Sequence, residues 1–426
     1  MEKDEVTHRS EETGETDEES RATDEEKDDK VDDDSDEIKI FVDGEEDTIT
    51  KNKAYFPEWN FDHVRPWVPL RRDDAYDNDQ ILQVAGHDLV MLEKANGFRT
   101  HGSVESGAFE AAKRIKNINP KVKVLFYLNA MIHYPHYEAD LTFKKDQWAM
   151  RDPKTNDFYL WNKRFVSYDH RNLEFREWWI TRALDMLQHD EIDGIFIDAI
   201  IKTAAVSNSI DAPDHDKAYI ETANDLRARL PEGKLLIGNA LRANAPKGAG
   251  GEGNIKHLKY LDGSYLENWD RSDEGIAKTI RLMRTALKAG RLIMFTSTPF
   301  SGYPLAKRYT EQQKEILATL KTMTADDKYP YIEQFIEFPL GVFLLAVEEF
   351  AYFSYHDSVD ASPRTGNAAF DCNRYVEITR QLGNPLGPYE EEGEFIFTRE
   401  FVNLKVWVDV QNKVGKLTVK EVRDEL

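Results

Sequence analysis

The chain has 426 residues, of which 40% are hydrophobic and 11% aromatic, enough apolar material for one large barrel or two average domains. Its formal charge is -23, but residues 1–37 hold 19 of the 79 acidic side chains and 5 of the 56 basic ones. The rest of the chain is moderately acidic and has no basic stretch of the kind that binds nucleic acid or an anionic membrane. A single cysteine, Cys372, excludes an intrachain disulfide framework and a zinc site built from paired cysteines.

Residues 1–37 are almost entirely polar; the only apolar residues are Met1, Val6, Ala22 and Val31. This segment cannot bury enough surface to offset the entropy of ordering, so we expect a disordered acidic tail. The chain shows no secretory signal and no apolar run long enough to span a membrane. We therefore expect a soluble protein, cytoplasmic by default, or secreted if the amino terminus is incomplete. Residues 423–426 resemble an endoplasmic-reticulum retention signal, which needs an entry signal to act.

Residues 54–394 alternate short apolar runs with segments whose apolar residues repeat at helical spacing. Runs such as 195–197 are apolar without alternation, which is typical of a parallel strand covered on both faces. Eight such strands with intervening helices predict a closed (β/α)8 TIM barrel, with an open doubly wound sheet as the competing α/β fold. The eight expected strands are 67–70, 88–93, 122–129, 194–198, 235–239, 264–268, 292–297 and 342–347.

The pattern changes again in residues 395–426. Residues 395–410 alternate as a strand does, residues 412–415 indicate a turn, and residues 416–420 return to a strand pattern. We expect a small C-terminal β element here, either a hairpin or a fragment of a sandwich.

In a TIM barrel the active site lies at the carboxyl ends of the strands, so the polar residues that close the runs are the catalytic candidates. Asp198 ends the buried run 194–198, and Glu267 lies near the end of the run 264–268. Two carboxylates at strand ends suit the cleavage of a glycosidic bond. One protonates the leaving oxygen while the other attacks or stabilises the oxocarbenium-like carbon. The alternatives are a helix cap or ion pair for Asp198 and a solvated strand end for Glu267.

Other polar and aromatic residues near the strand ends are candidates for binding sugar hydroxyl groups or shaping a sugar subsite. Glu93 has an alternative role as the ion-pair partner of Lys94 or Lys202, and Asp169 has one in local turn bonding. The candidate substrate-binding residues are Glu93, Tyr127, Asn129, His133, Asp169, Asn239 and Trp269.

The pair His133 and His136 resembles a metal-binding motif only superficially. Pro135 lies between them and would break the helix needed to place both rings on one face. We therefore predict no metal and no other cofactor. The expected partner is a carbohydrate substrate, without nucleic acid or membrane, and the sequence does not specify an oligomeric state.

Several short motifs occur in order along residues 55–412. They are Phe56-Pro57-Glu58-Trp59 with Asp62-His63-Val64, Leu92-Glu93-Lys94, the run from Val124 to Ala130, Tyr168-Asp169 with Arg176-Glu177-Trp178-Trp179, the run from Asp193 to Ala199, Gly238-Asn239, and the run from Leu382 to Gly387. This ordered set resembles the glycosyl-hydrolase-like TIM-barrel proteins, which are similar in outline to polysaccharide-cleaving barrels such as the endo-polygalactosaminidases. The resemblance implies a glycosidase-like barrel with Asp198 as nucleophile and Glu267 as acid/base.

The sequence thus predicts a glycoside hydrolase that acts on a polysaccharide or oligosaccharide. A separation of about 5 Å between the two carboxyl groups would indicate retention of configuration, and one of about 6.5–9.5 Å would indicate inversion. Three alternatives stay open: a sugar-binding barrel without turnover, a barrel lyase or isomerase that uses Lys94 or Lys202, and an interaction scaffold that uses the acidic tail.

Overall fold

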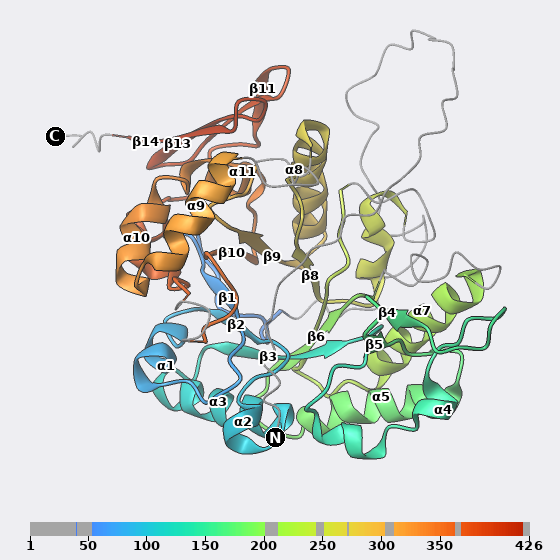
Figure 1. Ribbon diagram of the computed structural model, residues 1–426. Coiled ribbons are helices and arrows are strands. Elements are labelled where there is room, and N and C mark those ends of the chain that lie inside the picture. Colours follow the sequence, from blue (N-terminus) through green and yellow to red (C-terminus); the bar gives the residue numbers. More distant parts are fainter. Residues whose placement is uncertain are drawn as a thin grey trace, which may run out of the picture.

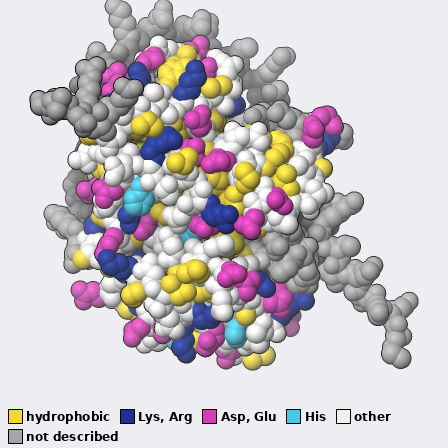
Figure 2. All heavy atoms as spheres, turned by 90° about the vertical axis from the view of Figure 1, so that its left-hand side faces the viewer, with side chains coloured by type: hydrophobic (Ala, Val, Ile, Leu, Met, Phe, Trp, Pro, Cys, Tyr) yellow, Lys and Arg dark blue, Asp and Glu magenta, His cyan; other side chains and the backbone are white. Residues whose placement is uncertain are grey.

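The structure is a computed structural model that describes residue 40 and residues 53–200, 212–243, 251–270, 272–302, 311–362 and 368–420. The expected acidic tail, the alternative residue Lys202 and the C-terminal tetrapeptide lie outside the described residues. On the face shown in Figure 2, lysine and arginine side chains are interspersed with aspartate and glutamate over the described surface. Of the helices in the described ranges, none is both long and apolar enough to cross a membrane.

Eight parallel strands form a nearly closed barrel in the order β1-β2-β3-β6-β7-β8-β9-β10 (Figure 1). The ring is completed next to β1, where the Phe353 amide donates a 2.9 Å hydrogen bond to the Arg65 carbonyl and Pro66 pairs with Phe353. The prediction of a (β/α)8 barrel over an open sheet is confirmed. The strands are β1 Trp67–Leu70, β2 Leu89–Leu92, β3 Lys123–Asn129, β6 Gly194–Asp198, β7 Leu235–Gly238, β8 Gly263–Leu266, β9 Leu292–Ser297 and β10 Ala351–Tyr355.

Helices connect the strands and cover the outside of the barrel (Figure 1). In α8 the Ser272 side chain accepts a hydrogen bond from the Gly275 amide, which caps the first turn. The apolar residues of this helix repeat at helical spacing, and this stripe, which includes Ile276, Ile280 and Met283, is buried. The helices are α1 Asn78–Val84, α2 Phe98–His101, α3 Val104–Ile118, α4 Lys145–Trp148, α5 Leu173–Met186, α7 Ala212–Arg229, α8 Asp273–Lys288, α9 Glu311–Thr322, α10 Ala325–Glu333, α11 Glu337–Ala346 and α12 Val376–Thr379.

The interior of the barrel is an apolar core that explains where polar residues meet. Side chains alternate between the two faces of a strand, so residues two apart point the same way. The inward-facing cluster includes Met91, Phe196 and Ile237. Glu93, Asp198 and Asn239 each lie two residues further on, and the alternation therefore directs them into the barrel's mouth. The full cluster is Phe56, Trp67, Leu89, Met91, Leu125, Tyr127, Phe196, Leu235, Ile237, Leu292, Met294 and Tyr352.

The prediction of the eighth strand at 342–347 is wrong, because those residues lie in or directly after helix α11. The eighth strand of the barrel is β10. Every residue from Phe338 to Ala346 is buried, since α11 packs against both the barrel helix α8 and the C-terminal sheet. A helix that is covered on all sides is apolar on all sides, so its sequence shows no helical periodicity.

The C-terminal β element is a four-stranded antiparallel sheet in the order β11-β12-β13-β14. Residues 395–410, expected as one strand, contain both β12 and β13 with a turn between them, because Phe401 to Asn403 interrupt the alternation. The sheet begins at β11, before the expected boundary at residue 395. Its strands are β11 Glu390–Gly393, β12 Ile396–Glu400, β13 Leu404–Asp409 and β14 Val414–Val419.

Candidate active site

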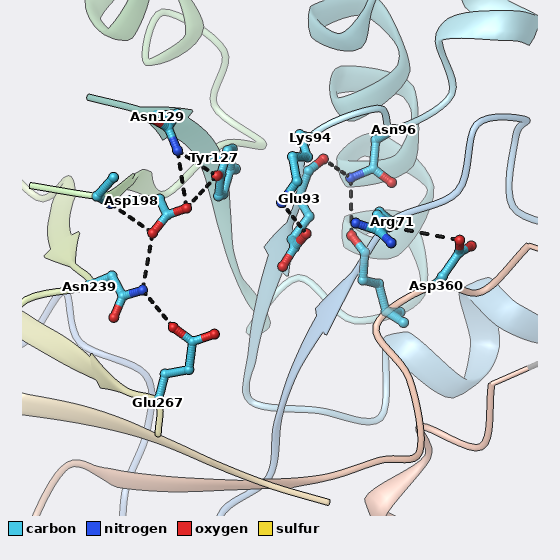
Figure 3. Close-up of polar contacts among 12 residues, drawn as sticks. Arg71, Glu93, Lys94, Asn96, Tyr127, Asn129, Asp198, Asn239, Glu267 and Asp360 are labelled. Atoms are coloured by element: carbon cyan, nitrogen blue, oxygen red, sulfur yellow. Dashed lines mark hydrogen bonds and ion pairs between the residues drawn. The ribbon is translucent and has the colours of Figure 1, made fainter. Parts of the chain in front are cut away.

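Asp198, at the carboxyl end of β6, accepts four hydrogen bonds from residues that the structure describes (Figure 3). Its Oδ2 accepts from the Tyr127 hydroxyl at 2.6 Å and from Asn129 Nδ2 at 3.1 Å. Its Oδ1 accepts from the Ala199 amide at 2.7 Å and from Asn239 Nδ2 at 3.0 Å. Donors on both oxygens stabilise a negative charge on this side chain. Asp198 is therefore held in place by β3, β6 and β7 together.

Glu267 follows β8 and is linked to Asp198 through one amide nitrogen. Asn239 Nδ2 donates to Glu267 Oε2 at 3.1 Å as well as to Asp198 Oδ1 at 3.0 Å. Because both bonds start at the same nitrogen, the two acceptor oxygens are separated by at most the sum of these distances, about 6.1 Å. Arg242 Nη2 also contacts Glu267 Oε2 at 3.1 Å, and the Glu267 side chain is 39% exposed.

The backbone turns sharply after each of the two carboxylates. Ala199 has φ of 60° and Asn268 has φ of 55°, both in the left-handed region that residues other than glycine rarely adopt. Such conformations cost about 1–3 kcal/mol each and cluster at functional sites. The turn at Asn268 also ends the alternation of β8, so the residues that follow Glu267 leave the mouth.

Glu93, at the end of β2, forms an ion pair with Lys94 at 3.1 Å. The Lys94 ammonium lies 4.9 Å from the ring centre of Tyr127 and 5.3 Å from that of Tyr134. Burial has the largest single effect and disfavours the charged form of Lys94, but Glu93, Tyr134 and Asp198 together outweigh it, and the pKa of Lys94 is raised. A lyase or isomerase that uses Lys94 would need a lowered pKa, so the structure disfavours that alternative.

Tyr127 is a donor that stays protonated. Its side chain is buried, and burial together with the adjacent Asp198 carboxylate raises the pKa of the Tyr127 hydroxyl well above its usual value. Asn129 is oriented from the other side, because its Oδ1 accepts from the amides of Met131 and Ile132 at 2.9 Å and 2.7 Å. Both candidate residues thus present hydrogen-bond donors to Asp198.

Of the nine candidate residues, the structure brings Glu93, Tyr127, Asn129, Asp198, Asn239 and Glu267 to the same end of the barrel (Figure 3). The side chains of the other three make their contacts with other residues. The His133 ring stacks on Phe143 and contacts the Tyr168 hydroxyl at 3.0 Å. Asp169 is bound by the Arg171 guanidinium at 2.8 Å and 2.9 Å.

Trp269 is the clearest correction among the candidates. Its side chain is 2% exposed, packs on Phe295 and donates to the Thr296 carbonyl at 2.9 Å. The left-handed turn at Asn268 directs the indole into the core, so it is not available to stack on a sugar.

Four residues near the mouth were missed by the sequence reasoning. Arg71 follows β1, and Arg242 lies on the loop after β7, where no periodic pattern marks it. Thr296 lies two residues after the inward-facing Met294, which is a signal that could have identified it. His356, whose Nε2 lies 3.2 Å from the Thr296 hydroxyl, was missed because the strand before it was assigned to the wrong segment.

The described residues contain no group of three or more histidine, cysteine, aspartate or glutamate side chains that could hold a metal ion.

The barrel, with carboxylates at the carboxyl ends of β6 and β8, defines a glycosyl-hydrolase-like TIM barrel. The model of the family described as "Hypothetical glycosyl hydrolase family 15" matches residues 116–405, and the chain belongs to that family. No curated protein is similar to the chain in sequence.

The solved structures that match the chain at low identity include glycosidases. The glycoside hydrolase domain of PelA from Pseudomonas aeruginosa is 12% identical with a TM-score of 0.39, covering 61% of this chain and 91% of that domain. The alpha-galactosidase TtGalA from Thermus thermophilus is 14% identical with a TM-score of 0.42, covering 83% of this chain and 68% of that one. The alpha-galactosidase AgaA from Geobacillus stearothermophilus is 12% identical with a TM-score of 0.41, covering 81% of this chain and 47% of that one.

Proposed function

We propose that this protein is a glycoside hydrolase that cleaves a polysaccharide or oligosaccharide with retention of configuration. Asp198 is the nucleophile and Glu267 is the acid/base. The observation that carries the proposal is the bridge through Asn239, whose single amide nitrogen donates to both carboxylates. It sets the two groups side by side at the mouth of a barrel from a glycosyl hydrolase family.

The distance between the carboxylates supports retention. Retaining enzymes hold their two carboxyl groups about 5–5.5 Å apart, and inverting enzymes hold them about 6.5–9.5 Å apart to admit a water molecule. The bridged oxygens Asp198 Oδ1 and Glu267 Oε2 lie within about 6.1 Å of each other, a range that includes the retaining separation.

The reaction then has two balanced steps. In the first, an Asp198 oxygen bonds to the anomeric carbon while the glycosidic C–O bond breaks, and Glu267 gives its proton to the departing oxygen. In the second, a water oxygen bonds to the anomeric carbon, Glu267 takes the proton, and Asp198 leaves as a carboxylate. The anomeric carbon is inverted twice, so its configuration is retained.

The surrounding residues have distinct roles in this proposal. Tyr127 and Asn129 fix the Asp198 carboxylate, and Arg242 fixes the Glu267 side chain through its 3.1 Å contact. Glu93 faces the same mouth and is available to accept hydrogen bonds from sugar hydroxyl groups.

The test is the release of reducing ends from galactomannan, xylan, pullulan, alginate and chitosan by wild type, Asp198→Asn and Glu267→Gln. We expect each substitution to lower kcat by at least about 10²-fold, in the range that general acid–base groups contribute. The exposed Glu391→Gln on β11 is the matched control and should retain full activity. Proton NMR of the first product should show the anomer of the substrate. Full activity in Asp198→Asn would overturn the assignment, and the opposite anomer would overturn retention.

A further inference from the structure

A small hairpin between β3 and β6 carries aromatic residues that the catalytic assignment does not use. Its strands are β4 Leu160–Trp161 and β5 Phe165–Val166, and Trp161 lies directly opposite Phe165 in the antiparallel pair. Residues directly opposite each other project from the same face of a hairpin. The hairpin is joined to the chain that leaves β3, because the His133 amide donates to the Val166 carbonyl at 2.9 Å.

Tyr134, Trp161 and Phe165 together form what we call the aromatic platform. The rings of Tyr134 and Phe165 are 5.0 Å apart in an edge-to-face arrangement. All three side chains pack on a small apolar cluster that contains Met131 and Ala199, and all three are only half-buried. Because Ala199 directly follows Asp198, the platform lies next to the nucleophile.

A second set of contacts links the aromatic platform to the catalytic pair. The Lys94 ammonium lies over both Tyr134 and Tyr127, at 5.3 Å and 4.9 Å from the ring centres. Tyr127 in turn donates the 2.6 Å hydrogen bond to Asp198. Tyr134 also packs against the inward-facing core of the barrel. The aromatic platform therefore extends from the barrel core to the hairpin.

Half-exposed aromatic rings beside a polar, carboxylate-bearing site suit one kind of ligand. Sugar rings have apolar C–H faces that pack on aromatic rings and hydroxyl rims that bind polar groups, and a binding site combines the two. Trp269, the aromatic residue expected to have this role, is buried.

We propose that the aromatic platform binds a sugar unit next to the one whose bond is cleaved, so that the enzyme acts on chains of sugars rather than on single-sugar glycosides. This inference rests on the proposed function, because it takes Asp198 and Glu267 as the point of cleavage. It adds a second subsite, which supplies a structural reason for the action on chains of sugars in the proposed function.

The test separates binding from turnover by using Asp198→Asn as the parent protein. Its retardation in native gels that contain galactomannan, xylan, pullulan, alginate or chitosan measures the affinity for each polymer. Trp161→Ala and Phe165→Ala should each lower the affinity for the polymer that retards the parent by at least about tenfold. Trp407→Ala, which removes a half-buried tryptophan from β13 in the C-terminal sheet, is the matched control and should change nothing.

A second measurement uses the active enzyme. In Trp161→Ala with Asp198 intact, kcat/KM should fall at least about tenfold more on the polymer than on the 4-nitrophenyl glycoside of the same sugar. Equal losses on both substrates, or unchanged affinity in both platform variants, would overturn the platform and leave the proposed function standing. Weakened binding in the platform variants, together with full hydrolysis by Asp198→Asn, would overturn the proposed function alone. Absence of both binding and hydrolysis by wild type would overturn both.

Discussion

The Tyr127 hydroxyl donates a 2.6 Å hydrogen bond to Asp198 Oδ2 from the neighbouring strand of the barrel. In the register of β3 and β6, Asn129 pairs with Asp198 and Tyr127 pairs with Phe196. Tyr127 therefore lies one layer deeper in the barrel than Asp198, and its hydroxyl extends to the Asp198 carboxylate. Burial and the carboxylate raise the pKa of this hydroxyl, which keeps its proton on the tyrosine. Asp198 is thus supported by a donor that keeps its proton near neutral pH.

The first prediction removes this donor. Tyr127→Phe keeps the ring, and with it the contacts to Lys94 and Phe196, but deletes the bond to the Asp198 carboxylate. Hydrogen bonds to charged groups contribute about 1.5–3 kcal/mol, so we expect kcat to fall by about 10–100-fold. Steady-state hydrolysis of the polymer that wild type cleaves is the measurement.

Tyr352→Phe provides the matched control for Tyr127→Phe. The Tyr352 hydroxyl is also buried and donates to the Pro57 carbonyl at 2.8 Å, away from the carboxylates. We expect a similar loss of stability in both variants and a loss of activity only in Tyr127→Phe. Equal activity of the two variants would contradict a role for Tyr127 in catalysis.

The second prediction concerns the bridge between the carboxylates. Asn239→Asp replaces the amide donor with a carboxyl group between Asp198 and Glu267, and a negative charge there repels the Asp198 carboxylate. We expect at least about a 10²-fold loss of kcat at neutral pH and about 1–3 kcal/mol less stability, measured by urea unfolding. Asn119→Asp, which loses a 2.9 Å bond to the Ala85 carbonyl outside the mouth, should keep its activity. An active Asn239→Asp enzyme would refute the bridge.

Much of the fold follows from local sequence signals, because buried parallel strands appear as continuous apolar runs. Side chains alternate between the two faces of a strand, and this alternation sets the direction of the polar residue that ends each run. Asp198, Asn239 and Glu93 were predictable for this reason. The segment that became α11 was not, since a helix buried on every side has no polar face to mark its period.

Parts of the site depend on long-range geometry that no local pattern encodes. Arg242 lies on a loop, and its contact with Glu267 depends on how β7 and β8 are placed side by side. The hairpin that carries Trp161 and Phe165 lies far from Asp198 in sequence. Trp269 was misplaced because one left-handed residue, Asn268, reverses the direction that alternation would give it.

The third prediction is a pH dependence of stability that arises from His170. This buried ring contacts the Ala130 carbonyl at 2.6 Å and the Thr222 hydroxyl at 2.9 Å. Burial lowers the pKa of His170 to about 3, despite the opposing effects of the Ala130 carbonyl and Asp169. The unfolded chain, with a usual pKa of about 6.5, therefore binds one more proton than the native state between about pH 3 and 6.5. The free energy of unfolding is therefore not reduced by His170 above about pH 6.5, and it decreases as the pH falls from about 6.5 to 3.

The measurement is urea unfolding of wild type and His170→Gln at pH 7 and pH 5. The variant lacks the titrating ring. The difference in the free energy of unfolding between wild type and His170→Gln should therefore be smaller at pH 5 than at pH 7 by about 2 kcal/mol. His101→Gln, at an exposed position, should keep the pH slope of wild type. A deficit in His170→Gln that is the same at both pH values would show that His170 does not carry the effect.

The last prediction tests how closely the barrel packs below Glu267. Gly263 begins β8, and a Cβ atom at this position would lie 2.0 Å from the Leu292 carbonyl oxygen on β9, so β8 could not keep its place. Overpacking costs typically about 1–3 kcal/mol and more against backbone, so Gly263→Ala should lose at least about 3 kcal/mol in urea unfolding. Since Glu267 follows on the same strand, activity should fall as well. Gly387→Ala, with open space around its Cβ position, should change the stability by less than about 0.5 kcal/mol. If the two variants were equally stable, the close approach of β8 and β9 at Gly263 would be refuted.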